Sequence, residues 1–168
     1  VYGLRISALA KKYGVTIAVG AMKYENKTLT NCTYFVDANG NFSDTVYEKR
    51  HLVPFGEYMP MRDFLTVIFP FLAEVSMLSY DMTPGNETDV YYADGIGSIC
   101  SIICFDSIYE ELTLDSVRDG AELILLSTND SWFKDSVAVY MHSSQAKLRS
   151  IETGRCTVRA ACTGVSQI

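Results

Sequence analysis

One continuous stretch decides the fold: "SIICFDSIYEELTLDSVRDGAELILLST", residues 101–128. Its apolar start predicts the end of a buried strand that stops at a sharp turn. Ser107 precedes Glu110 by three residues, which is a capping-box pattern for a helix start, and Gly120 suits the helix end. "AELILLST" then predicts a second buried strand. Strand, turn, helix and strand in this order predict a right-handed crossover between parallel strands.

The residues before this unit predict a helix followed by hairpins. "LRISALAKKYG" (residues 4–14) has helical spacing and ends in two Lys and a Gly, and "VTIAVGAMKY" (15–24) predicts a strand. Two alternating runs around "DANGN" (37–41) predict a hairpin, and residues 88–105 predict another that ends in the buried strand. Between Pro60 and Gly85 we expect an irregular apolar region.

The residues after the crossover complete the pattern. Residues 136–155 predict a long helix and residues 156–166 a last strand. Because helices alternate with strands, we expect an α/β fold in one domain, without internal repeats or linkers.

Composition excludes several classes of function. The 168 residues are 48% apolar and 20% charged, which is typical of a globular domain. The net charge is −6 and the basic residues are scattered, so we expect no nucleic-acid partner. No apolar run approaches the length of a membrane-spanning helix. The five cysteines follow neither CxxC nor Cys/His spacing, and we expect no metal and no cofactor.

Cys104 is the candidate nucleophile. It ends the first strand of the crossover, where α/β folds place reacting groups, and a helix start just beyond it would favour the thiolate. The alternative is an inert buried thiol, which is the more common state of this residue type. Cys100 lies in the middle of the same strand and is assigned to the core.

The stretch "YEKRHLVPFGEYMP" (residues 47–60) offers a partner for this thiol. A Cys nucleophile needs a proton acceptor and a group that stabilises the oxyanion. His51 and His142 are the two histidines, and neither sits in a Cys/His signature. Lys49 is the candidate for the oxyanion, because its apolar, Pro and Gly neighbours restrict a side chain that is usually solvated. We expect the strands that end at Lys49 and Cys104 to present the same sheet edge.

"YEKRHLVPFGEYMP", "IICFD" and "STNDSWF", in this order and at these distances, resemble the apolipoprotein N-acyltransferases, a membrane-bound family of the carbon–nitrogen hydrolase (nitrilase) superfamily. The resemblance covers nearly the whole chain. It implies a nitrilase-like α-β-β-α sandwich, truncated at both ends. Residues 1–168 would be a partial catalytic domain, with the membrane bundle and the first strands absent from it.

The resemblance also implies a Glu–Lys–Cys triad, with Lys49 at the oxyanion and Cys104 as the nucleophile. The family's Glu, the general base, belongs to a Pro-Glu motif that has no counterpart before Lys49, and Glu25 stands in a turn context instead. We therefore expect the 168 residues alone to be nearly inactive.

Further site positions follow from the same resemblance. Glu57 matches another active-site Glu and would position Lys49 or gate the pocket. Asp106 replaces a Glu of the family pattern, and Phe105 replaces a frequent Tyr. Phe105, Asn129 and Trp132 would line the substrate pocket; without the resemblance, "NDSWF" could instead be a capped turn with Trp132 as a packing anchor.

The reaction that the resemblance implies is acyl transfer through a Cys thioester. A phospholipid is the acyl donor, and the N-terminal amine of a diacylglyceryl-cysteine lipoprotein is the acceptor. The place would be the bacterial inner membrane, with the catalytic domain on its periplasmic face. The apolar loop from Phe64 to Leu78 would contact the membrane surface, or would be buried in the core.

Two other functions stay open. A soluble nitrilase-like amidase would use the same Cys and Lys on a small amide or nitrile. A non-catalytic remnant that binds lipid or protein would need neither.

Overall fold

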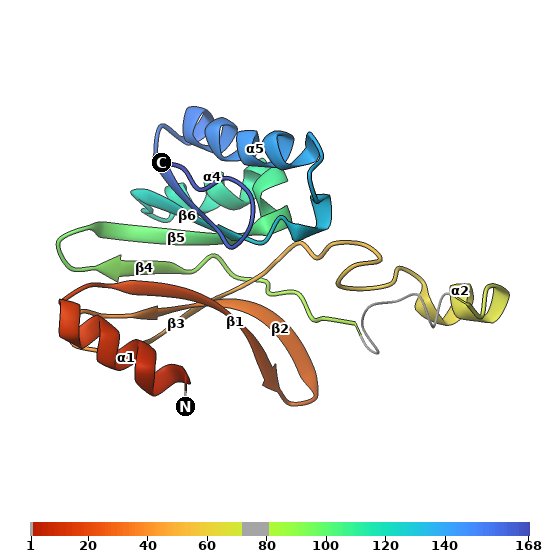
Figure 1. Cartoon of the computed structure of the whole chain (residues 1–168), viewed down its shortest axis with the longest axis horizontal. Helices are drawn as coiled ribbons and strands as arrows, with labels where there is room; N and C mark the ends of the chain where they lie inside the picture. The colour runs from red at the N-terminus through yellow and green to blue at the C-terminus, as the bar shows by residue number, and fades with distance from the viewer. Residues whose placement is uncertain (1, 72–80) are drawn as a thin grey trace.

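The computed structural model describes residues 2–71 and 81–168, in which two β-sheets lie face to face between outer helices (Figure 1). The first sheet and its covering helix comprise α1 (Tyr2–Tyr13), β1 (Ile17–Glu25), β2 (Thr28–Val36) and β3 (Phe42–Glu48). The second sheet comprises β4 (Val90–Ala93), β5 (Gly97–Ile103), β6 (Leu123–Thr128) and β7 (Cys156–Ala161), and its covering helices are α4 (Glu110–Arg118) and α5 (Ala138–Thr153). The predicted α-β-β-α sandwich is confirmed.

The first sheet is antiparallel in the order β1-β2-β3. The turn between β1 and β2 uses Asn26 and Lys27, both with positive φ, which a two-residue hairpin of this kind requires. The turn between β2 and β3 is held by the Asp37 carboxylate, which accepts hydrogen bonds from the backbone N–H groups of Asn39 and Asn41 at 2.9 and 2.8 Å. The hairpin predicted from "DANGN" is confirmed.

The second sheet contains the predicted crossover. β4 pairs antiparallel with β5, and β5, β6 and β7 run parallel. Covering layers on both faces explain why β5 and β6 are so apolar. Cys100, Ile102 and Leu126 lie in the core beneath α4 and α5, and Ile99 lies in the core between the two sheets.

Besides this apolar core, an aromatic stack and a buried hydrogen bond join the two sheets. The rings of Phe35 and Tyr91 are stacked with centroids 4.4 Å apart. Ser101 Oγ donates to Thr33 Oγ1 at 2.9 Å, so that β5 packs on β2 with its polar groups satisfied. These contacts fix β5, and with it the position of Cys104, against the first sheet.

The predicted capping box at Ser107 and Glu110 is wrong. Cys104–Ile108 form a short 3₁₀ turn, η1, and α4 begins only at Glu110. Ser107 Oγ donates to the Cys104 carbonyl at 2.7 Å, so its hydroxyl is used within the turn. No α-helix N-terminus therefore lies directly beyond the Cys104 thiol, and the expected helix-dipole effect on that thiol loses its structural basis.

The region after Pro60 also differs from the expected irregular chain, because Arg62–Ile68 form helix α2. Asp63 stands in the first turn, where a negative side chain is favourable, and Arg62 pairs with Asp81. The helix projects away from the sandwich (Figure 1). Of the predicted apolar loop from Phe64 to Leu78, residues 72–78 lie outside the described residues.

Across the described ranges, no helix combines the length and the apolar character needed to cross a bilayer.

We expect Leu126→Ala to lower the free energy of unfolding by about 2–5 kcal/mol, because it empties a site that is fully buried between β6 and the helices. Leu4→Ala on α1 is the matched control, since this leucine is 79% exposed. The urea dependence of alkylation at the buried Cys100 thiol measures both variants in the full-length protein. Equal protection in the two variants would contradict the assigned core.

Candidate active site

Cys104 follows β5 directly and adopts a left-handed backbone, with φ of 51°. This conformation is strained for a residue other than Gly and persists only where neighbours enforce it, as at many functional turns. The side chain is half-buried. Cys104 thus combines a strained turn at the end of β5 with a partly exposed thiol.

Asp106 enforces the turn from within. Its carboxylate is fully buried and accepts from the Ile103 N–H at 3.0 Å, the Tyr47 hydroxyl at 2.8 Å and the His51 N–H at 2.8 Å. Burial raises the pKa of Asp106, and these hydrogen bonds, with the charge of Lys49, offset part of the rise. Asp106 thus ties the Cys104 turn to the end of β3.

Lys49 is buried at the end of β3 and paired with Glu57. Its side chain is 1% exposed, and Nζ lies 2.8 Å from Glu57 Oε1 and 2.6 Å from Glu57 Oε2. Glu57 Oε2 also accepts the Val53 N–H at 2.8 Å, which fixes the carboxylate on the loop that carries it. The charged ammonium is therefore held in one place by a carboxylate that is itself held.

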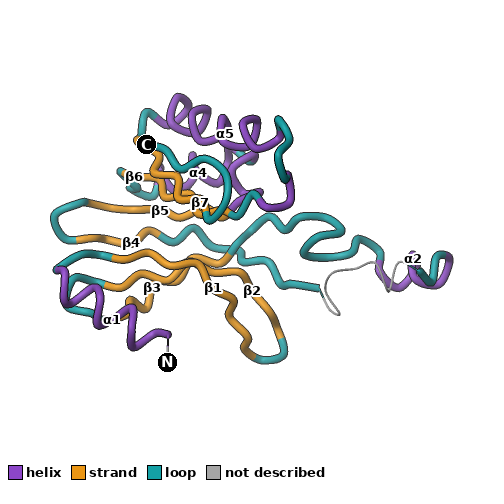
Figure 2. Tube along the Cα trace, in the orientation of Figure 1, coloured by secondary structure: helices purple, strands orange, loops and turns teal. Residues whose placement is uncertain are grey.

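The strands that end at Lys49 and Cys104 belong to two different sheets rather than to one (Figure 2). Their ends meet across the sandwich, because Tyr47 and His51, on either side of Lys49, both donate to Asp106, two residues beyond Cys104. The structure thus brings Lys49, Glu57, Cys104 and Asp106 into one region.

The three predicted pocket residues lie in the turns that follow β5 and β6. Phe105 packs edge-on against Tyr109 with ring centroids 5.6 Å apart. Asn129 Oδ1 accepts from Thr163 Oγ1 at 2.8 Å, which joins its turn to the last residues of the chain. Trp132, in the short turn η2 (Ser131–Phe133), is 58% exposed, so it is not a packing anchor here.

A buried polar cluster next to the Cys104 turn was not predicted from the sequence. Asp130 Oδ2 accepts from Arg159 Nη2 at 2.7 Å, and Asp130 Oδ1 lies 2.8 Å from His142 Nδ1. Burial alone would raise the pKa of Asp130, but hydrogen bonds from Arg159, His142 and Thr128 outweigh it and hold the pKa below its usual value. The feature of the sequence that could have predicted this cluster is Arg159, a charged residue in the middle of the mainly apolar strand β7.

The other cysteines contrast with Cys104. Cys32 and Cys100 are buried, and burial raises the pKa of each thiol to about 11. Cys156 and Cys162 are exposed on or beyond β7. Only Cys104 combines partial burial with a strained turn at the end of a strand.

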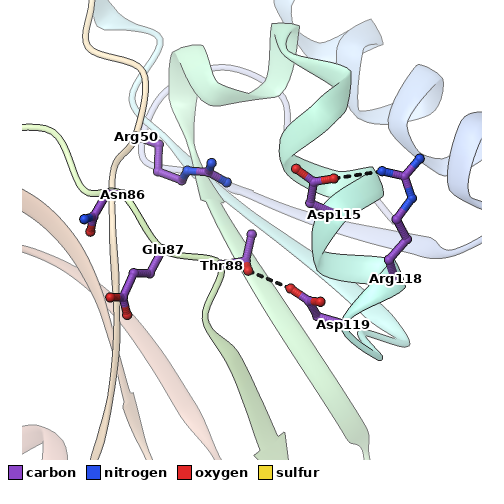
Figure 3. A pocket seen from close by; sticks show the side chains of 7 residues that line it. All are labelled: Arg50, Asn86, Glu87, Thr88, Asp115, Arg118 and Asp119. Atoms are coloured by element: carbon purple, nitrogen blue, oxygen red, sulfur yellow. Dashed lines mark hydrogen bonds and ion pairs between the residues drawn. The ribbon is translucent and has the colours of Figure 1, made fainter.

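A surface cavity of 520 Å³ lies beside α4 and takes no part in this arrangement (Figure 3). Within it, Thr88 Oγ1 donates to Asp119 at 2.7 Å and Arg118 pairs with Asp115 at 2.9 Å. It is lined by Arg50, Asn86, Glu87, Thr88, Asp115, Arg118 and Asp119. None of the candidate site residues lines it.

We expect Glu57→Gln to lower the free energy of unfolding by about 3–5 kcal/mol, because it leaves the buried Lys49 ammonium without its counter-charge. The matched control is Glu25→Gln, which removes a pair with Lys23 at the surface and should cost about 0–1 kcal/mol. Protection of the Cys100 thiol in urea measures both. A loss as small for Glu57→Gln as for Glu25→Gln would show that Lys49 does not depend on Glu57.

Known proteins resemble this chain in sequence and in fold. Apolipoprotein N-acyltransferase from Methylococcus capsulatus is 35% identical over 97% of this chain and 31% of its own length, and the one from Geobacter metallireducens is 33% identical over 99% and 32%. A carbon-nitrogen hydrolase from Helicobacter pylori superposes with a TM-score of 0.70 at 18% identity, covering 98% of this chain and 51% of that one. An amidase from Nesterenkonia sp. gives 0.67 at 17%, with 95% and 51% covered.

The chain thus spans about a third of the length of these curated relatives. The family described as carbon-nitrogen hydrolase matches residues 4–168. By this match and by its α-β-β-α sandwich, the chain belongs to the carbon–nitrogen hydrolase family.

Proposed function

We propose that this chain is the Cys- and Lys-bearing part of an apolipoprotein N-acyltransferase. The observation that carries the proposal is the linkage through Asp106, which joins the strained Cys104 turn to the strand end that carries the buried Lys49. The names and identities of the curated relatives support the choice of reaction. The protein would act at the bacterial inner membrane, with this domain on the periplasmic side.

In the first half-reaction, Cys104 Sγ attacks the ester carbonyl of a phospholipid. A C–S bond forms, the ester C–O bond breaks, and the lysophospholipid leaves as an alcohol that takes up a proton. In the second half-reaction, the amine of a diacylglyceryl-cysteine lipoprotein attacks the thioester. A C–N bond forms, the C–S bond breaks, and the thiol is restored.

Lys49 is suited to stabilise the oxyanion in both halves. An ammonium has three N–H donors, and the two Glu57 oxygens engage two of them, which leaves one for a substrate oxygen. A donor that is fixed before the reaction stabilises the transition state without having to reorganise.

The nearby carboxylates are poorly placed to accept the proton of the thiol, because their oxygens already accept hydrogen bonds from other groups. Asp106 accepts three hydrogen bonds, and Glu57 accepts from Lys49 and from Val53. We place the acceptor on a carboxylate outside these 168 residues, in keeping with relatives that are about three times as long. The truncated sandwich and the expected inactivity of the isolated 168 residues belong to the same proposal.

Helix α2 and the residues after it supply a contact for lipid. The apolar side chains exposed along this projecting segment are Phe64, Val67, Ile68, Phe69 and Phe71. Exposed apolar side chains on one short segment are typical of a surface that lies in a membrane interface.

We expect incubation of the full-length protein with phospholipid to add one acyl chain to Cys104, seen by intact mass and lost on treatment with hydroxylamine. Cys104→Ala should acquire none, whereas Cys100→Ala, at a core position, should still be acylated. An acyl chain on Cys104→Ala would refute the assignment. Hydrolysis of small amides without acylation by phospholipid would favour the amidase function instead.

We expect Phe64→Glu combined with Phe69→Glu to raise the KM for phospholipid in vesicles about tenfold or more, because two charges replace apolar side chains at the interface. Turnover of a soluble short-chain ester should stay unchanged, since neither residue contacts Cys104 or Lys49. Leu4→Glu on α1 is the control, since it places a charge at an even more exposed apolar position on another element. An unchanged vesicle KM would remove α2 from the lipid contact.

A further inference from the structure

His142 contacts the nucleophile's own backbone. It lies on α5, is 8% exposed, and its Nε2 is 3.2 Å from the Cys104 carbonyl oxygen and 3.3 Å from Ser107 Oγ. Phe133 packs edge-on against the ring with centroids 5.5 Å apart. The imidazole is therefore fixed from several sides, and one of its two nitrogens faces the Cys104 turn.

The contacts of Nδ1 fix its proton. Nδ1 lies 2.8 Å from Asp130 Oδ1, and a carboxylate accepts hydrogen bonds only. The other oxygen of Asp130 is occupied by the Arg159 guanidinium, at 2.7 Å, which keeps the carboxylate ionised and in place. Nδ1 therefore carries a hydrogen and donates it to Asp130.

The Nε2 side then closes a small network on the Cys104 carbonyl. A carbonyl oxygen accepts hydrogen bonds only, so Nε2 holds it through a second ring hydrogen, and the ring that makes both contacts is the imidazolium. Ser107 Oγ donates to the same carbonyl oxygen at 2.7 Å, so Ser107 and His142 converge on one acceptor. Arg149 Nη1 holds Ser107 from the other side by donating to its carbonyl at 3.1 Å. Holding the Cys104 carbonyl restrains the peptide group that follows this residue, and with it the strained turn from which Sγ projects.

We propose that His142 is a positioning residue for the nucleophile: anchored by Asp130, it holds the Cys104 carbonyl together with Ser107 and so aims Sγ at the acyl carbon. His142 does not touch substrate in this assignment. It acts through the backbone of Cys104, and Asp130 and Arg159 act through His142.

Two substitutions of His142 each remove one of the two contacts of its ring. His142→Asn places an amide N–H near the position of Nδ1 and keeps the bond to Asp130, but it loses the contact with the Cys104 carbonyl. His142→Gln reaches the position of Nε2 and keeps a donor to that carbonyl, but it loses Asp130. A positioning role predicts that His142→Gln retains more activity than His142→Asn, whereas a role in stability alone predicts no such order.

In the experiment, 4-nitrophenyl butyrate acylates Cys104 in the full-length protein. The rate of the initial burst of nitrophenolate gives the rate constant of acylation. This activated ester acylates a nucleophilic thiol whatever the natural donor is. The inference rests on the proposed acyl-enzyme function, and failure of the wild-type protein to accept phospholipid would overturn that function without touching the comparison of variants.

We expect His142→Asn to lower the acylation rate constant about 10- to 100-fold with little change in KM, because a small displacement of the attacking atom costs rates of this order. Alkylation by iodoacetamide, a small electrophile with little need for orientation, should change less than about threefold at each pH from 6 to 9. Lys147→Asn, at an exposed position of α5, should leave both rates at the wild-type level.

The same alkylation experiment reports folding, since Cys32 and Cys100 are buried and react only when the fold opens. Should His142→Asn expose them, Ser107→Ala tests the other half of the network and should lower acylation in the same direction. Acylation within about twofold of wild type in a folded His142→Asn or in Ser107→Ala would overturn the proposal. Equal losses in His142→Asn and His142→Gln would overturn it as well.

Discussion

The buried carboxylate of Asp106 is the constraint on which the site depends. It is fully shielded from water, so its negative charge is tolerated only while donors surround it. Those donors come from both halves of the sandwich: Ile103 at the end of β5, and Tyr47 and His51 around the end of β3. Because each donor is needed, separating the two strand ends would leave the buried Asp106 carboxylate without hydrogen-bond donors. The geometry between Cys104 and Lys49 follows from that requirement.

The sandwich makes this linkage possible. β5 is covered on one face by α4 and α5 and on the other by the first sheet, so the strand that presents Cys104 is among the most restrained in the chain. The buried bond between Ser101 and Thr33 adds a polar contact in the layer between the sheets. A rigid strand that ends in a strained turn places a reactive side chain with little freedom, and such rigidity favours a catalytic site over a merely structural one.

Much of this could be predicted from local patterns. The run "SIICF" and the crossover that follows it indicate a strand buried on both faces. "DANGN" indicates the hairpin between β2 and β3, because the Asp37 carboxylate can accept from the N–H groups two and four residues ahead. The position of Cys104 at a strand end follows from the same patterns.

The rest depends on contacts that no local pattern contains. The capping box failed because the Ser107 hydroxyl is used by Cys104, and the helix start is set instead by a 3₁₀ turn. Arg159 and His142 are 17 residues apart and look unrelated until β7 and α5 place both beside Asp130. Long-range pairing of buried charges is decided by packing, so it becomes visible only in three dimensions.

The three carboxylates differ in the groups that they bind. Glu57 is committed to an ammonium, Asp130 to a guanidinium and an imidazole, and Asp106 to neutral N–H and O–H donors. A carboxylate paired with a fixed cation is stabilised in its charged form and is a weak proton acceptor, whereas a general base must take up a proton near neutral pH. Burial raises the pKa of Asp106, but its oxygens are engaged by the N–H groups of Ile103 and His51 and by the Tyr47 hydroxyl. These three groups therefore shape and hold the candidate site, and the proposed acyl transfer assigns its proton transfer to a carboxylate that is not among them.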